Sequence, residues 1–167
     1  RPHAHAALRL VASHLPTALK NNEIEDRQAL LLAAFHGGVA IAACSTAIAH
    51  CLSHALAGLA PVHHGLATAL AFEATLPWLV EHPTPELRSA AAALDLPGPA
   101  ALPGFVTRLM DDAGIERRLP EAFQGFAPRT LCAEALRPEN APMRRATARD
   151  VTEDDLLTFS QTFLALA

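Results

Sequence analysis

Charged and aromatic residues are scarce in this chain, and each shortage excludes something. Only 18% of the 167 residues are Asp, Glu, Lys or Arg, tyrosine is absent, and the net charge is −4. No basic stripe is present, so the sequence predicts no nucleic-acid partner. The β-branched and aromatic residues that favour strands are few, whereas Ala and Leu dominate. Because Ala and Leu are the best helix formers, the composition predicts a helical protein.

Cysteine is also sparse, and its spacing argues against a disulfide framework. The three cysteines, Cys44, Cys51 and Cys132, are odd in number and include no Cys-x2-Cys pair. A reducing compartment fits this pattern, and we expect the cytoplasm. Cys44 and Cys51 fall in an apolar helical stretch, where we expect each to be a small buried thiol.

A secretory signal is missing from the sequence as given. The chain begins RPHAHAAL, without an initiator Met and without a basic segment before an apolar core, so we expect a trimmed start or a position inside a longer protein. The run from Ala29 to Ala49 is long enough to span a bilayer. It is mostly Ala, contains His36 and a Gly37-Gly38 pair, and continues into a histidine cluster. We interpret it as the central helix of a soluble bundle and expect no membrane partner.

Helical signals follow one another along the chain, and no segment shows the alternation of a strand. Acids at Glu23–Asp26 precede the longest apolar run, the turn at Gly58–Pro61 ends it, and Thr152 before three acids predicts an N-cap. The predicted fold is one all-α domain, 1–167, of seven to nine helices. The expected helices are His5–Leu19, Glu25–Ala57, Gly65–Val80 with a kink or break at Pro77, Glu86–Leu94, Phe105–Ala113, Leu119–Phe126, Pro128–Leu136 and a last one from Thr152 to the end.

Histidine is what the sequence has in excess. Nine are present, and four fall within HCLSHALAGLAPVHH, from His50 to His64. His50 and His54 lie one turn apart on the same helical face. The turn at Gly58–Pro61 lets the following helix bring His64 near His50, and His5 opens the first helix. Imidazoles converging from three helices suit a divalent Fe, Zn, Co or Ni ion. A His-x3-His pair also occurs by chance, so a hydrogen-bonded core or surface role stays open.

The spacing gives a geometric expectation for these side chains. The ring nitrogens of His5, His50 and His64 should lie within roughly 5 Å of one another, since two ligands about 2.1 Å from one ion are no further apart than twice that. His54 should lie alongside, outside this set, and His63 is the alternative to His64. The remaining histidines show no partner pattern and are expected in the core or at the surface: His3, His14, His36 and His82.

The segment from His50 through Pro77, HCLSHALAGLAPVHHGLATALAFEATLP, resembles the signature of the iron-containing alcohol dehydrogenases, a family that includes the maleylacetate reductases. The family pattern there is a His, three residues, a second His, a small-residue turn, His-Gly, a helix and Leu-Pro. The opening HAHAAL resembles the family's earlier Asp-x3-His-Ala motif, with His5 in the His position. The closing segment from Thr152 resembles the end of the family's helical domain. The resemblance covers nearly the whole chain and is closest from His50 to Pro77.

This resemblance implies the C-terminal helical domain of a two-domain enzyme, with a dehydroquinate-synthase-like helical fold. The N-terminal α/β domain of such enzymes binds NAD(P). No glycine-rich dinucleotide motif follows a strand in this chain, so that domain is expected as a partner. The implied ligands of Fe2+ or another divalent metal (Zn, Ni or Co) are His5, His50 and His64. His54 is implied to lie near the nicotinamide and a small alcohol, aldehyde or ketone substrate, with a catalytic part in proton relay.

Arg1 departs from the family pattern, because it stands four residues before His5, where the family has Asp. The maleylacetate reductases replace this Asp by Asn and work without a metal. A metal-free domain of that kind is therefore one alternative, with the histidines themselves polarising the substrate oxygen. A non-catalytic helical module that binds a partner or a metal is another. Because this domain packs against a nucleotide domain in the family, we expect an apolar surface on it, and a homo-oligomer as one further partnership.

Overall fold

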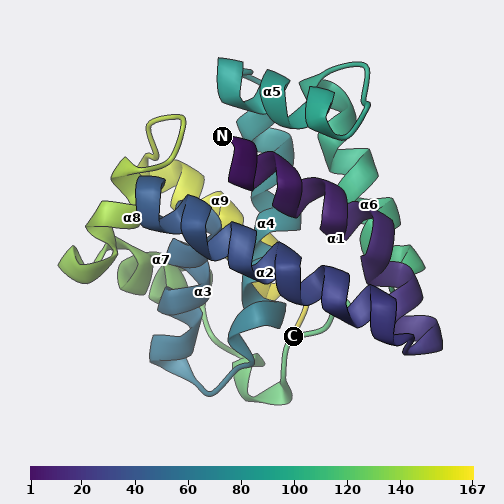
Figure 1. Cartoon of the computed structure of the whole chain (residues 1–167). Helices are drawn as coiled ribbons and strands as arrows, with labels where there is room; N and C mark the ends of the chain where they lie inside the picture. Colours follow the sequence, from purple (N-terminus) through teal and green to yellow (C-terminus); the bar gives the residue numbers. More distant parts are fainter. The chain divides into compact units, whose positions relative to one another are not determined.

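The computed structural model describes residues 1–167 and contains nine α-helices, three short 3-10 helices and no strand (Figure 1). This confirms the all-α prediction and the predicted number of helices. The contacts divide the chain into two compact units, residues 1–45 with 80–116 and residues 46–79 with 117–167. The expectation of a single domain over 1–167 stays a prediction.

The first unit is built on a helical hairpin of α1 (Pro2–Asn21) and α2 (Ile24–Cys44). Asn22 adopts a left-handed conformation, φ 58°, which ends α1 and turns the chain within two residues. His14 Nδ1 lies 2.6 Å from Asp26 Oδ1 across the hairpin, so the two helices run antiparallel (Figure 1). The unit is completed by three further helices: α5 (Pro85–Ala93), η1 (Pro99–Ala101) and α6 (Leu102–Asp112).

The expected burial of α2 is wrong. Only Ala33 of this helix is buried, whereas Leu31 is 72% and Phe35 62% exposed. Cys44, expected as a buried thiol, is exposed at the end of α2, while Cys51 is buried as expected. The reason is that α2 is apolar on all sides, so a single neighbouring helix covers only one stripe of it. By length and composition alone, α2 is the one helix that could cross a membrane, a test that signal sequences and core helices also pass.

The predicted helix Glu25–Ala57 is in fact two helices, α2 and α3 (Ile48–Leu59). The chain leaves the helical conformation at Ser45, where φ is 69°, and Ala47 is extended. No Pro or Gly marks this break, so the sequence signals of a helix end are missing there. The break lets α3 begin at Ile48, which places His50 in its first turn.

The second unit packs α3 and α7 (Pro128–Leu136) with α9 (Glu153–Leu164) around an apolar core. The side chains that fill this core are less than 2% exposed: Leu52, Leu56, Leu131, Leu156 and Phe163. The unit also holds α4 (His64–Val80, whose last residue belongs to the first unit), η2 (Glu121–Phe123), η3 (Pro138–Asn140) and α8 (Ala141–Arg145). Of the predicted helix Leu119–Phe126, only the short η2 forms.

Polar contacts tie the far end of α4 to the start of α9. The indole Nε1 of Trp78 donates to Asp155 Oδ1 at 2.9 Å, and the guanidinium of Arg149 stacks 4.2 Å from the Trp78 ring centre. Asp155 also completes a capping box with Thr152, as the sequence predicts for this helix start. Pro77 does not break α4, which continues to Val80, so that part of the expectation is wrong, while a kink at Pro77 stays a prediction. These contacts hold the α4 end firmly although Pro77 removes one helical hydrogen bond.

Candidate histidine site

Three of the clustered histidines meet at the surface of the second unit, where the first half of α3 lies beside the start of α4; His50 is half-buried, and His54 and His64 are exposed. The ring centroids of His50 and His64 are 5.4 Å apart, as are those of His54 and His64, and His50 and His54 are separated by 6.5 Å. His50 and His54 share a face of α3 because they lie four residues apart. The turn after α3 returns the chain so that α4 begins at His64, as the spacing predicts.

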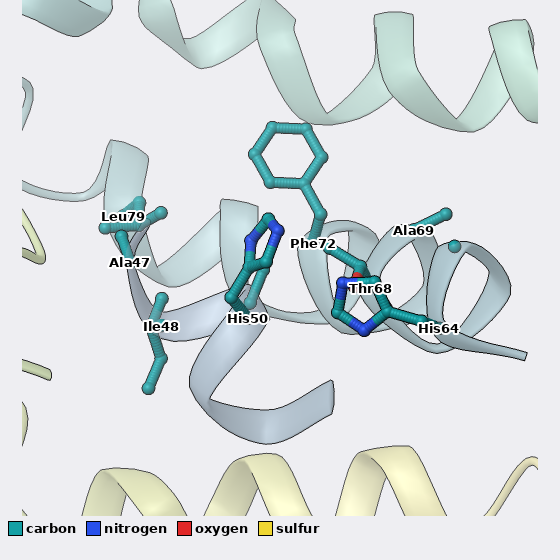
Figure 2. A pocket seen from close by; sticks show the side chains of 10 residues that line it. Ala47, Ile48, His50, His64, Thr68, Ala69, Phe72 and Leu79 are labelled. Atoms are coloured by element: carbon teal, nitrogen blue, oxygen red, sulfur yellow. The ribbon is translucent and has the colours of Figure 1, made fainter. Parts of the chain in front are cut away.

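His50 and His64 line a cavity of about 570 Å³ within this unit (Figure 2). Apart from the two imidazoles, its only polar side chain is Thr68, which follows His64 by one helical turn. No Lys, Arg, Asp or Glu side chain reaches it. The other lining residues are apolar or glycine: Ala47, Ile48, Ala49, Gly65, Ala69, Phe72 and Leu79. The cavity therefore offers one polar end on an otherwise apolar wall and has the volume of a small-molecule site.

Ser53 fixes the ring of His64. Its side chain is completely buried, and its Oγ lies 3.1 Å from Nδ1 of His64 and also donates to the His64 carbonyl at 3.4 Å. Because Nδ1 is occupied by this contact, Nε2 is the ring nitrogen of His64 left for a ligand. Sequence reasoning missed Ser53, although it lies three residues after His50 on the same helical face.

The hydroxyl of Thr68 is buried and has no hydrogen-bond partner. A helical threonine commonly donates to the carbonyl four residues earlier, which here belongs to His64. That carbonyl instead accepts from Ser53. Sequence reasoning also missed Thr68, although its spacing of four from His64 places it on the same helical face.

Burial is the main cause of a lowered pKa at His50, and the nearby charges of His64 and His54 lower it further. A lowered pKa favours the neutral imidazole, which is the form that accepts a hydrogen bond or binds a metal. The lowered pKa therefore favours a neutral His50 ring near neutral pH, with a lone pair on one nitrogen that can bind a metal or accept a hydrogen bond.

His63 lies outside the cluster. It is exposed, and its Nδ1 accepts from the backbone N–H of Leu66 at 3.4 Å, so it caps the start of α4. The structure thus brings His64, rather than His63, against His50.

His5 belongs to the first unit, where its Nε2 lies 2.9 Å from Ser89 Oγ. Its predicted convergence with His50 and His64 stays a prediction. No group of three or more His, Cys, Asp or Glu side chains is arranged to hold a metal ion. His54 is as near to His64 as His50 is, but it does not line the cavity.

Acidification should destabilise the chain through His50. In the folded state the pKa of His50 lies below its ordinary value of 6.5, so the unfolded chain binds more protons in this range. The contribution of His50 to the free energy of unfolding is therefore fully present above the unfolded pKa and is lost as the pH falls through the folded pKa. Urea unfolding is measured at a pH above 6.5 and at a pH below the folded pKa of His50. Between these two pH values the free energy of unfolding should fall more for the wild type than for His50→Gln. Equal losses in both proteins would contradict the assignment.

The comparisons with known proteins identify the family. The model of the Fe-containing alcohol dehydrogenase family, C-terminal, matches residues 3–155, which include the whole histidine cluster and His5. Arg1 lies outside the matched residues. No curated protein and no solved structure matched the chain. Because the family model covers most of the chain, the chain belongs to the C-terminal domain of the iron-containing alcohol dehydrogenase family.

Proposed function

We propose that this chain supplies the substrate-oxygen site of an NAD(P)-dependent alcohol dehydrogenase or carbonyl reductase, whose nucleotide is bound by an N-terminal domain. The observation that carries the proposal is the pair His50 and His64, 5.4 Å apart between ring centroids, at the polar end of an apolar cavity. Family membership supports the reaction class. The free thiols support a reducing compartment, and we propose the cytoplasm.

The chemistry of the donor set fits a divalent transition metal. Imidazole nitrogen suits Fe, Zn, Co and Ni, and the lowered pKa of His50 favours its ligating form. His50 and His64 would hold the ion, with His5 as the proposed third ligand. A bound ion supplies Lewis acidity to the substrate oxygen. Ser53 orients the His64 ring through its contact with Nδ1, the nitrogen that would not bind the ion; metal-binding histidines commonly have such a hydrogen-bond partner on their other ring nitrogen.

The cavity wall sets what the site accepts. Phe72, Ile48 and Leu79 offer apolar surface for the carbon part of a substrate. Because the lining carries no cationic side chain, an anionic substrate finds no counter-charge there. A small uncharged alcohol, aldehyde or ketone fits best. His54 is the proposed residue that passes a proton between the substrate oxygen and water, a role supported by its closeness to His64 and its exposure to solvent.

The nicotinamide supplies the hydride chemistry when it is bound. This chain contains no strand and so no dinucleotide-binding turn, which makes the N-terminal domain a required partner in the proposal. In this proposal His50 and His64 position the substrate oxygen, and His54 moves its proton.

A metal-free mechanism is the second candidate. The residue that supports it is Arg1, which stands four residues before His5, where the resemblance to the family implies Asp. In that case His50 and His64 stabilise the oxygen by hydrogen bonds alone.

Chelation separates the two candidates. With a metal in use, treating the two-domain enzyme with a strong chelator should reduce NAD(P)H-coupled turnover by about 100-fold or more, as expected for the loss of several kcal/mol of Lewis-acid stabilisation. Added Fe2+ or Zn2+ should restore the wild type but not His64→Ala. Activity that survives chelation yet falls in His64→Ala supports the metal-free candidate. Activity that is indifferent to both treatments overturns the site.

A further inference from the structure

His3 and His36 form a second pair of facing imidazoles, in the first unit. His3 lies in the first turn of α1 and His36 in the middle of α2. Their Nδ1 atoms are 2.8 Å apart, and their ring centroids are 5.0 Å apart with the planes inclined by 46°. The contact joins residues 33 positions apart in the sequence. Sequence reasoning predicted no partner for either histidine, and their surface position is as expected.

The rigid antiparallel hairpin fixes this pairing. The His14–Asp26 contact sets the register near the turn, and the His3–His36 contact lies at the open end of the same two helices. Hydrogen bonds with His14 and Thr17 lower the pKa of the Asp26 carboxyl. At the turn end of the hairpin, His14 therefore already has a carboxylate partner. The His3–His36 end has no carboxylate partner and faces solvent.

The separation of the two nitrogens matches the geometry of a chelate. Two nitrogens at about 2.1 Å from one ion and at right angles to each other are about 3.0 Å apart. The observed 2.8 Å requires only a small outward movement of the two rings, of which His3 is exposed and His36 partly exposed. Neutral imidazoles at this distance share a single proton, and a metal ion would replace that proton between the two lone pairs.

We propose that His3 and His36 form a surface site for a divalent transition metal that favours nitrogen ligands in a square or tetragonal arrangement, such as Ni2+ or Cu2+. Water completes the coordination, because no third His, Cys, Asp or Glu joins the pair. The nearby charge of Arg1 is already engaged by Glu86, 2.9 Å away. A bound ion clips α1 to α2 at the open end of the hairpin. The site is separate from His50 and His64, and it does not depend on the proposed function.

Ni2+ binding to the whole chain tests the proposal. Equilibrium dialysis with NiCl2 is carried out on the wild type, His3→Ala, His36→Ala and the control His82→Ala, which removes an exposed histidine without an imidazole neighbour. Loss of an outer partner of a metal ligand typically weakens binding ~10–100-fold, and loss of a ligand should matter no less. We expect His3→Ala and His36→Ala to weaken one class of bound Ni2+ by about tenfold or more, with His82→Ala unchanged.

Two further measurements keep the outcome interpretable. Circular dichroism should show that His3→Ala, at the exposed first turn, keeps its helix content, and Ni2+ should raise the melting temperature of the wild type more than that of either variant. His64→Ala should leave this class of Ni2+ intact, so failure of the proposed dehydrogenase site cannot be mistaken for failure here. Unchanged Ni2+ affinity and stoichiometry in both His3→Ala and His36→Ala would overturn the proposal.

Discussion

Replacing His64 by alanine should reduce hydride transfer by the two-domain enzyme about 100-fold or more, which corresponds to a loss of roughly 3 kcal/mol in transition-state stabilisation. His64 contacts His50, lines the cavity and is oriented by Ser53. Its loss removes one of the two imidazoles that act on the substrate oxygen. Steady-state turnover of NAD(P)H with a panel of small aldehydes and ketones measures the effect.

The neighbouring residue provides a matched control. His63 caps α4 by accepting from the Leu66 N–H, and asparagine can make the same kind of cap. His63→Asn should therefore keep both the helix start and the activity. A large loss of turnover in His63→Asn, with full turnover in His64→Ala, would show that His63 and not His64 is the residue required for activity, and would contradict the proposed site.

The 167-residue chain on its own should show no turnover of NAD(P)H or NAD(P)+ with alcohols, aldehydes or ketones. It consists of helices alone, so it has no strand-to-helix turn that could hold the nucleotide pyrophosphate. The expected effect is complete loss relative to the two-domain enzyme. Absorbance at the reduced nicotinamide band measures it directly.

Joining the chain to its nucleotide-binding domain should restore the activity, and the same fusion carrying His64→Ala should not recover it. Turnover by the isolated chain that exceeds background, and that disappears in His64→Ala, would show that the nucleotide is bound without the second domain.

Local signals were enough to predict most helix ends. Thr152 followed by three acids predicted the start of α9, and the structure shows the full capping box. The bounds of α7 were predicted to the residue, from Pro128 to Leu136. These features depend on neighbours within one helical turn, and the sequence displays them directly.

Long-range contacts were not predictable in the same way. The break at Ser45 carries no Pro or Gly, and the exposure of α2 depends on how little of it the other helices cover. The pairing of His3 with His36 arises from the hairpin register, which no local pattern specifies.

The histidine site also has features that local spacing predicted and features that it did not. The spacing of four between His50 and His54, together with the intervening turn, predicted that His64 would approach them. The contributions of Ser53 and Thr68 come from packing between α3 and α4. The link from this cluster to His5 stays a prediction.

The central claim is that His50 and His64 act together on one oxygen atom. A double-mutant cycle of kcat/KM in the two-domain enzyme tests it, using His50→Ala, His64→Ala and the double variant, because residues that act as a unit give strongly non-additive losses. Each single variant should lose most of the activity, and the double variant should lose little more than either. Losses that multiply in the double variant, or single variants that retain wild-type kcat/KM, would contradict it.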